Sequence, residues 1–461
     1  MFFTYQPDYA GTQAQKLHLQ AHICDWDEAK DDLTFLADLG IRKEDVPPFT
    51  LLALEDDPSR HRLRSENHAN KKFSQNATIN FVAPNQKSKR LRIGYFSADF
   101  HNHATMYLMA QVFTKHDKSN FEVLAFSYGI NTQDEMRQRL VNDVDTFHDV
   151  SDMSDLEIID LARKERLDIA VDLKGYTEGN RLALFAYGLA PVQISYLGYP
   201  GTLGTKFIDY IIADPIVIPE DKRPYYSEKI IYLPNAYQPT DNTRKISDKA
   251  ITRAEMGLPD NGFVFCCFNN NYKISPKEFD IWMRLLGKVD DSVLWLFKSN
   301  RWAEQNLKRE AERRGIVAER LIFAEKLPQA KHLARLKLAD LFLDTFNYNA
   351  HTTASDALWA DLPIVTKLGE GFAARVAGSL LSALDLPELT TNNETEYEKL
   401  ALELATNREK LASIKQKLAI NRSSKPLFNT ELFTKHLEDG YQRAYQRYFE
   451  GKKAATIYVP E

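Results

Sequence analysis

A run of small and hydroxyl residues near position 350 is the strongest candidate for a ligand site. Residues 347–359 follow an apolar strand that ends at Asp344, and they are expected to open a helix with Thr352 and Thr353 near its start. The first amides of a helix have no partner within it and carry a partial positive charge, so they suit an anion such as a phosphate. Asp356, one turn further on, could accept hydrogen bonds from ribose hydroxyls. The same pattern also fits a helix cap without any ligand.

A lysine stands in a second polar loop, residues 269–276, between a predicted strand and a helix that begins with a proline. Lys273 in this loop could neutralise a phosphate as a compact point charge. The ordinary alternative is a solvated lysine on the surface.

Two histidines, His101 and His103, follow Asp99 just beyond the first strand of the α/β region. The pKa of an unperturbed imidazole is about 6.5, so a histidine here could transfer a proton or donate a hydrogen bond to a substrate. A structural role is the alternative. These residues lack a third metal ligand at a suitable spacing, so we expect no metal. The glycine-containing loops 174–177 and 197–202 also end strands, but such loops are turns first.

Alternating short strands and helices must position these residues. In a first lobe, from about 90 to 240, strands are predicted at 91–97, 121–128, 169–173, 192–197 and 210–214, with a helix near 133–143. In a second lobe, 255–425, strands are predicted at 263–268, 292–297, 321–323, 341–344 and 363–366, with helices at 275–286, 302–314 and 329–337. This alternation is typical of parallel sheets covered by helices, whose ligands lie beyond the carboxyl ends of the strands. Two such lobes would form a cleft between them.

The two ends of the chain have a different pattern. Residues 1–75 have the loose three-and-four spacing of an amphipathic helical segment, and the polar stretch 74–89 is the best candidate for a linker. Residues 426–461 include a long predicted helix, 430–449, that is expected to pack back on the lobes. The predicted fold class is therefore α/β, with two Rossmann-like lobes, an N-terminal helical segment and a C-terminal helix.

Composition narrows the function classes. The 461 residues are too many for one ordinary core. A net charge of -5 argues against a nucleic-acid partner, because neutralising several phosphates needs a concentrated excess of Lys and Arg. The three cysteines include the adjacent pair Cys266 and Cys267, which fits a reducing compartment better than a disulfide framework. No signal peptide and no apolar stretch of about 18 residues is evident, so we expect a cytoplasmic protein without a membrane partner.

The order of these motifs resembles the catalytic region of the O-linked N-acetylglucosamine transferases and their SPINDLY-type fucosyl relative. The resemblance covers nearly the whole chain and rests on His103, His332 and residues 91–99, 168–177, 190–193, 197–204, 209–210, 226–229, 268–269, 272–273, 338–340, 351–356 and 375–377. It implies a glycosyltransferase of the GT-B type that works without a metal or another cofactor.

The resemblance also implies roles for individual residues. The residues expected to hold the UDP part of the donor are Lys273, Thr352 and Thr353 at the diphosphate, His332 and Arg335 at the uracil, and Asp356 at the ribose. The residues expected to lie near the sugar are His351, Leu197, Gly198 and Pro200, with Asn270 near the donor loop. Lys273, His103 and His351 are the candidate catalytic residues, His103 for proton transfer or substrate positioning.

The implied function is inverting transfer of N-acetylglucosamine, or another hexose, from a UDP-sugar to Ser or Thr of a protein or peptide. Three departures from the family pattern leave the sugar open: Asn270 replaces a glutamine, Gln329 replaces a lysine that faces the ribose, and Lys174 replaces a neutral polar residue. The alternatives are N-glucosylation of Asn from UDP-glucose, O-fucosylation from GDP-fucose, and a sugar-nucleotide-binding protein without turnover. The chain begins near the point where the family's tetratricopeptide repeats end, which leaves acceptor recognition open.

Overall fold

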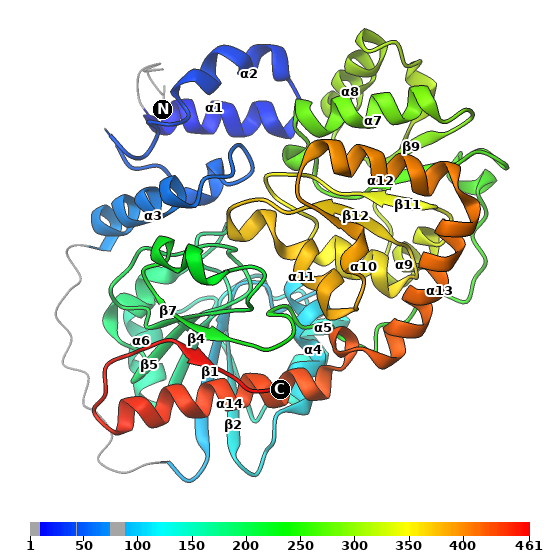
Figure 1. Cartoon of the computed structure of the whole chain (residues 1–461). Helices are drawn as coiled ribbons and strands as arrows, with labels where there is room; N and C mark the ends of the chain where they lie inside the picture. Colours follow the sequence, from blue (N-terminus) through cyan, green and yellow to red (C-terminus); the bar gives the residue numbers. More distant parts are fainter. Residues whose placement is uncertain (1–9, 43, 74–87) are drawn as a thin grey trace. The chain divides into compact units, whose positions relative to one another are not determined.

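The computed structural model describes residues 10–42, 44–73 and 88–461. The predicted linker, 74–89, lies almost wholly outside the described residues. Contacts divide the chain into two compact units (Figure 1). Unit 1 comprises residues 1–46, 50–57 and 244–425, and unit 2 comprises residues 47–49, 58–243 and 426–461.

Unit 2 is built on a parallel sheet. Among the described residues this sheet has eight strands in the order β14-β7-β6-β5-β4-β1-β2-β3. The strands are β1 (Leu91–Ser97), β2 (Phe121–Ser127), β3 (Thr146–Asp149), β4 (Ile169–Asp172), β5 (Val192–Ser195), β6 (Tyr210–Ala213), β7 (Lys229–Tyr232) and β14 (Ile457–Tyr458). The helices of this unit are α3 (Pro58–Phe73), α4 (Ala104–Lys115), α5 (Glu135–Asp143), α6 (Asp155–Lys164) and α14 (Thr430–Phe449).

The C-terminal helix α14 packs on unit 2 (Figure 1). The buried hydroxyl of Tyr441 on α14 accepts a hydrogen bond from the Tyr95 hydroxyl of β1 over 3.2 Å. Glu438, also on α14, lies 3.0 Å from Nδ1 of His116, which follows α4. These buried polar contacts tie the helix to the sheet and confirm that it packs back on the α/β fold.

Unit 1 is built on a second parallel sheet. Among the described residues this sheet has six strands in the order β10-β9-β8-β11-β12-β13. The strands are β8 (Val264–Cys267), β9 (Val293–Phe297), β10 (Leu321–Ala324), β11 (Leu341–Leu343), β12 (Ile364–Lys367) and β13 (Thr390–Thr391). Its helices are α1 (Ala10–His22), α2 (Trp26–Asp32), α7 (Pro276–Lys288), α8 (Arg301–Arg313), α9 (Gln329–Leu336), α10 (Thr352–Trp359), α11 (Val376–Ala383), α12 (Glu394–Thr406) and α13 (Arg408–Ser424).

Both sheets have the strand patterns that their sequences predict. Each of the strands β4, β5, β6 and β8 is buried along its whole length, as expected where helices cover a parallel sheet. The prediction of two parallel α/β units is confirmed. No helix within the described ranges is both long and apolar enough to span a membrane.

The N-terminal helix α1 supports one loop of unit 1. Its rings His18 and His22 lie 5.9 and 4.8 Å from the ring of Tyr272. Beyond its end, the Cys24 thiol donates to the carbonyl of Asn271 over 3.6 Å. Tyr272 and Asn271 belong to the short 3-10 helix η6 (Asn271–Lys273), so α1 braces the segment that carries Lys273.

Candidate functional site

Lys273 is buried in unit 1, at the carboxyl end of β8. The capping box that Ser275 and Glu278 form fixes the start of α7 immediately after it. The ammonium nitrogen donates to the carbonyl of Asn349 over 3.0 Å and lies 3.7 Å from the ring centroid of Tyr348. A cation held over an aromatic face and by a carbonyl has a defined position, unlike a solvated lysine. The alternative of a surface lysine is therefore wrong.

Burial changes the acid–base behaviour of Lys273. Removal from water disfavours the charged form and lowers the pKa of the amine to about 7, although the nearby Asp344 carboxylate favours the charge. Without a ligand, the amine is therefore poised between its charged and neutral forms near neutral pH. An anion bound beside it would favour the ammonium form.

Asp344 organises the loop that leads from β11 to α10. The fully buried carboxylate accepts hydrogen bonds from the backbone amides of Thr345 and Ala350 over 2.8 and 2.6 Å, and from the Thr366 hydroxyl over 2.7 Å. Burial raises the pKa of Asp344 to about 6, and the hydrogen bonds and Lys273 oppose that rise. Because its partners lie on both sides of the loop, this side chain holds residues 345–350 in place.

The helix α10 begins at Thr352, as its sequence predicts, and Thr353 lies in its first turn. The Thr353 hydroxyl donates to the side-chain oxygen of Asn269 over 2.5 Å, which joins the loop after β8 to the start of α10. The amides of a first helical turn have no partner within the helix, so this end of α10 presents N–H donors beside the Lys273 loop.

His351 occupies the N-cap position of α10, but its side chain does not cap the helix. Its Nε2 lies 3.1 Å from the carbonyl of Ala373, which can only accept, so Nε2 carries the proton. Burial lowers the pKa of His351 well below the ordinary value, and the charge of Lys273 lowers it further. The ring is therefore neutral at neutral pH and its orientation is fixed.

His332 and Arg335 lie side by side on α9. Nε and Nη2 of Arg335 approach Nδ1 of His332 to 3.1 and 2.9 Å, so Nδ1 accepts and the proton of the neutral ring is on Nε2. Burial lowers the pKa of His332 to about 4, with Asp356 opposing. The Arg335 guanidinium lies 4.9 Å from the ring centroid of Phe268, and burial lowers its pKa to about 10. The neutral imidazole of His332 and the cationic guanidinium of Arg335 are both planar and lie side by side. Such a pair suits contact with a planar heterocycle.

Asp356 is buried on α10 and has several protein partners. Its Oδ1 pairs with Arg244 and accepts from Gln329 over 3.2 Å, and its Oδ2 lies 3.9 Å from Nε2 of His332. Arg244 was not a predicted site residue. Asp356 thus has one cationic partner, Arg244, and one neutral hydrogen-bond donor, Gln329.

His103 lies in unit 2, where it caps α4. Its Nδ1 accepts from the amide of Thr105 over 3.2 Å and lies 3.6 Å from Oδ2 of Asp99. Lys174 donates to the same Asp99 oxygen over 2.8 Å. This grouping of a histidine, a carboxylate and a buried lysine follows from the pairing of β1 with β4, whose carboxyl ends are adjacent.

Leu197, Gly198 and Pro200 form a tight turn after β5 in unit 2. Leu197 has a backbone φ of 69°, a left-handed conformation that residues other than glycine rarely adopt. The Gly198 amide donates to the carbonyl of Tyr196 over 2.9 Å. A Cβ at Gly198 would lie 2.1 Å from the carbonyl oxygen of Leu173. Only glycine allows this approach of two backbones, so the turn brings main chain close to the end of β4.

The predicted site residues thus fall into two groups. Those that lie in unit 1, in the segment after β8, on α9 and at or near the start of α10, are Lys273, His332, Arg335, His351, Thr352, Thr353 and Asp356. Asn270 is exposed beside them and bonds Lys273 through its backbone carbonyl, over 3.0 Å. His103, Leu197, Gly198 and Pro200 belong to unit 2. The sequence analysis did not identify Asp344 and Tyr348 as site residues. Their position after the carboxyl end of β11, where ligands of such sheets bind, could have indicated them.

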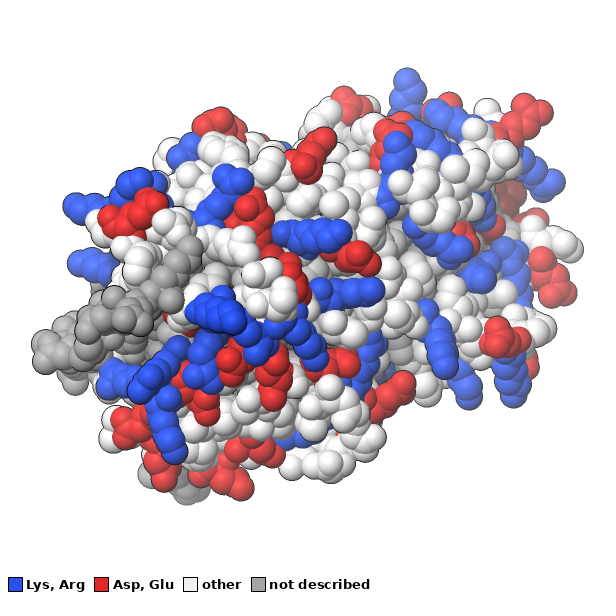
Figure 2. Space-filling view, turned by 90° about the horizontal axis from the view of Figure 1, so that it is seen from below, with Lys and Arg blue, Asp and Glu red and all other residues white. Residues whose placement is uncertain are grey.

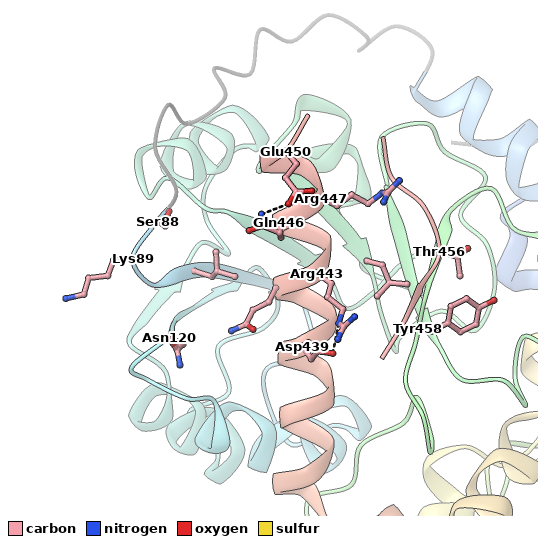
Figure 3. A pocket seen from close by; sticks show the side chains of 13 residues that line it. Ser88, Lys89, Asn120, Asp439, Arg443, Gln446, Arg447, Glu450, Thr456 and Tyr458 are labelled. Carbon is pink, nitrogen blue, oxygen red and sulfur yellow. Dashed lines mark hydrogen bonds and ion pairs between the residues drawn. The ribbon is translucent and has the colours of Figure 1, made fainter. Parts of the chain in front are cut away.

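A separate cavity of about 710 Å³ lies beside α14 in unit 2 (Figure 3). Its lining includes Leu91 at the start of β1 and Asn120 just before β2, so it is at the amino ends of these strands. The side chains of Arg443 and Asp439 pair with each other there over 2.7 Å. Ligands of parallel α/β sheets bind at the opposite, carboxyl ends, so this cavity is not the candidate site. Within the described ranges, no three His, Cys, Asp or Glu side chains are placed to hold a metal ion.

The sequence and the fold of this chain match known proteins. The family model of glycosyl transferase family 41 matches residues 66–250 and 244–437. The SEC protein of Arabidopsis thaliana is 38% identical over 81% of this chain and 39% of its own length. The UDP-N-acetylglucosamine–peptide N-acetylglucosaminyltransferase of Caenorhabditis elegans is 28% identical over 79% of this chain and 42% of its own length. The chain thus spans about two-fifths of these relatives.

Solved structures agree. An O-GlcNAc transferase mutant of Thermobaculum terrenum superposes with a TM-score of 0.85 at 26% identity, over 97% of this chain and 86% of that one. HepE of Anabaena, solved with UDP and glucose, has a TM-score of 0.51 at 13% identity, over 77% of this chain and 100% of that one, and shares the fold alone. The predicted GT-B architecture is confirmed. The chain belongs to glycosyl transferase family 41.

Proposed function

We propose that this chain is a metal-independent, inverting glycosyltransferase that moves N-acetylglucosamine from UDP-N-acetylglucosamine to Ser or Thr of proteins. The observation that carries the proposal is the buried Lys273 ammonium beside the start of α10, in a family 41 fold. The relatives' names specify the sugar and a peptide acceptor. Three buried free thiols support a reducing, cytoplasmic location. Lys and Arg interspersed with Asp and Glu on the face drawn in Figure 2 support the absence of a nucleic-acid partner.

The groups of unit 1 match the parts of a UDP-sugar. Lys273 and the first amides of α10, with the Thr352 and Thr353 hydroxyls, would hold the diphosphate. The edge that His332 and Arg335 form would face the uracil, with Nε2–H of His332 as a donor. Asp356 would accept from the ribose, held in place by its ion pair.

The proposed chemistry follows from the position of Lys273. When the bond from the sugar carbon to the β-phosphate oxygen breaks, negative charge builds on that phosphate. A fixed cation and fixed amides stabilise this charge more in the transition state than in the ground state, which is the role a metal has in other enzymes. His351 is neutral and donates to a backbone carbonyl, so it contributes position rather than charge.

The test is transfer from a panel of labelled donors. The purified chain is incubated with UDP-N-acetylglucosamine, UDP-glucose or GDP-fucose and with protein and peptide acceptors, and the labelled residue is mapped by mass spectrometry. We expect label on Ser or Thr from UDP-N-acetylglucosamine. Calorimetry should give tighter binding of UDP than of GDP, because His332 and Arg335 form the base site.

The same assay separates the alternatives. Label on Asn from UDP-glucose would favour the N-glucosyltransferase, and tighter GDP binding would favour the fucosyl branch. UDP binding without label from any donor would indicate a binding protein. Transfer should persist in EDTA, and activity lost in EDTA and restored by manganese would contradict the metal-independent mechanism.

Binding of UDP should weaken as the pH rises above about 7. Burial lowers the pKa of Lys273 to about 7, so above that pH the free protein must take up a proton when the diphosphate binds. Linkage makes the dissociation constant rise by up to about tenfold per pH unit there. Calorimetry in buffers of different ionisation enthalpy measures the proton uptake directly.

The Lys273→Met variant is the control for this pH dependence. UDP itself titrates, and that contribution is common to both proteins, so the difference between them isolates the lysine. A wild-type profile that parallels the Lys273→Met profile from pH 6 to 9 would contradict a titrating lysine at the diphosphate.

A further inference from the structure

A buried ion pair lies at the carboxyl edge of the unit 2 sheet. Strands β1 and β4 are neighbours in register, with Phe96 opposite Asp172, so the residues that follow them lie side by side. Lys174 is only 5% exposed, and its ammonium donates to Oδ2 of Asp99 over 2.8 Å. Backbone amides of Lys174 and Gly175 bond to the Asp172 carboxylate over 3.0 and 2.8 Å, which fixes the start of this loop. The Lys174 ammonium is thus held in a defined position, where it donates to Oδ2 of Asp99.

The same Asp99 oxygen faces His103 without bonding it. Oδ2 lies 3.6 Å from Nδ1 of His103, beyond hydrogen-bond distance. Nδ1 accepts instead from the Thr105 amide over 3.2 Å, as the N-cap of α4. A nitrogen that accepts carries no proton, so the neutral ring has its proton on Nε2. In this arrangement Nε2 carries the proton of the neutral ring and has no lone pair with which to accept another.

Two states of His103 therefore compete. In one, Nδ1 accepts from Thr105 and Nε2–H donates. In the other, Nδ1–H donates to Asp99 or to the Thr105 hydroxyl oxygen, 3.2 Å from Nδ1, and Nε2 can accept a proton, the arrangement of a general base. The negative charge of Asp99 favours the second state, and Lys174 neutralises that charge.

We propose that Lys174 is a positioning residue that withholds the Asp99 carboxylate from His103 and so keeps His103 as a neutral Nε2–H donor. This inference rests on the proposed function, in which His103 would then orient the acceptor or the sugar by donating a hydrogen bond and would not remove a proton. It assigns a role to a lysine at which this chain departs from the family pattern.

Other titratable and charged groups lie around Asp99, His103 and Lys174, and they are the same in every variant below. The titratable and charged groups that face them are His101, Asp134, Asp172, Tyr128 and Arg181. Burial raises the pKa of Asp172 to about 6, and its carboxylate already has two amide donors. The substitutions below leave all five of these groups in place.

The test reads the His103 ring directly by NMR. Long-range proton–nitrogen spectra of histidine-labelled protein distinguish the two tautomers, and His103→Gln identifies the resonance. We expect the Nε2–H form in the wild type. Lys174→Gln should shift the ring toward Nδ1–H and raise the His103 pKa by about one unit, because the Asp99 charge is no longer neutralised.

Substitution of Asp99 should shift the His103 pKa in the opposite direction. Asp99→Asn leaves the Lys174 charge alone and should lower the His103 pKa, whereas the double variant Asp99→Asn with Lys174→Gln should return it near the wild-type value. Lys174→Arg restores the charge and should restore the Nε2–H tautomer. A merely structural role would change the melting temperature without this sign reversal.

Several outcomes would overturn the inference. They are an Nδ1–H tautomer in the wild type, shifts of the same sign in both single variants, and an unchanged ring in Lys174→Gln. If Lys174→Gln does not fold, the neutral double variant and Asp99→Asn still decide the sign. These spectra need no substrate, so they fail or succeed independently of sugar transfer. Loss of transfer with the expected tautomers would count against the proposed function alone.

Discussion

Lys273→Ala is expected to lower kcat for sugar transfer by roughly two orders of magnitude, equivalent to about 3 kcal/mol of transition-state stabilisation. The ammonium is positioned by the Asn349 carbonyl at 3.0 Å and the Tyr348 ring at 3.7 Å before any ligand arrives. A preorganised charge of this kind acts mainly on the leaving phosphate in the transition state. Binding of UDP should weaken less than kcat falls, because His332 and Asp356 remain. Steady-state kinetics and calorimetry measure the two effects separately.

Controls separate this role from a structural one. Lys273→Arg should rescue activity only in part, because a planar guanidinium does not reproduce the compact ammonium. Lys277→Ala, which removes an exposed lysine from the first turn of the adjacent α7, should leave kcat unchanged. A folded Lys273→Ala protein with near-wild-type kcat would leave the proposed diphosphate site without its main support. Circular dichroism and thermal melts establish that the variant is folded.

The architecture could be predicted from the sequence where apolar runs are long. The predicted helix 430–449 coincides with α14, and the strands predicted for both lobes are present within a few residues. Strand β3 was missed because its four residues are half-exposed at the sheet edge and form no apolar run. Helix α4 was missed because its start is capped by His103, an uncommon cap, rather than by Ser, Thr, Asn or Asp.

Candidate site residues could be selected from the sequence by residue type and position, but their environment could not be predicted. Lys273 was placed correctly after β8, yet its burial depends on Asn349, 76 residues further along the chain. The ion pair of Asp356 with Arg244 joins residues 112 positions apart, and no local pattern indicates it. Periodicity and motif spacing report neighbours along the chain, whereas the pKa of a buried group is determined by neighbours in space.

Asp344→Ala is expected to destabilise unit 1 by about 3 kcal/mol and to weaken UDP binding by at least about tenfold. The buried carboxylate accepts from two amides and a hydroxyl, and the alanine would leave these donors buried without a partner. The loop of residues 345–350 would lose its anchor, and with it the Asn349 carbonyl that holds Lys273.

Asp344→Ala should also change the protonation of Lys273. Asp344 raises the pKa of Lys273 against the effect of burial, so its removal leaves less of the lysine protonated near neutral pH. The loss of UDP affinity should therefore be smaller at pH 6 than at pH 8, because at pH 6 the lysine regains its proton. Asp344→Asn keeps the shape and should lie between alanine and wild type in stability.

Glu388→Ala is the matched control for Asp344→Ala. Glu388 is an exposed carboxylate of the same unit and pairs with Lys417 at the surface, over 2.7 Å. Such pairs contribute about 0.5 kcal/mol, so stability and UDP binding should stay near those of the wild type. Denaturant unfolding and calorimetry at both pH values give the comparison. If Asp344→Ala lost stability but bound UDP as tightly as the Glu388→Ala protein at pH 8, the loop from β11 to α10 would not be part of the proposed diphosphate site.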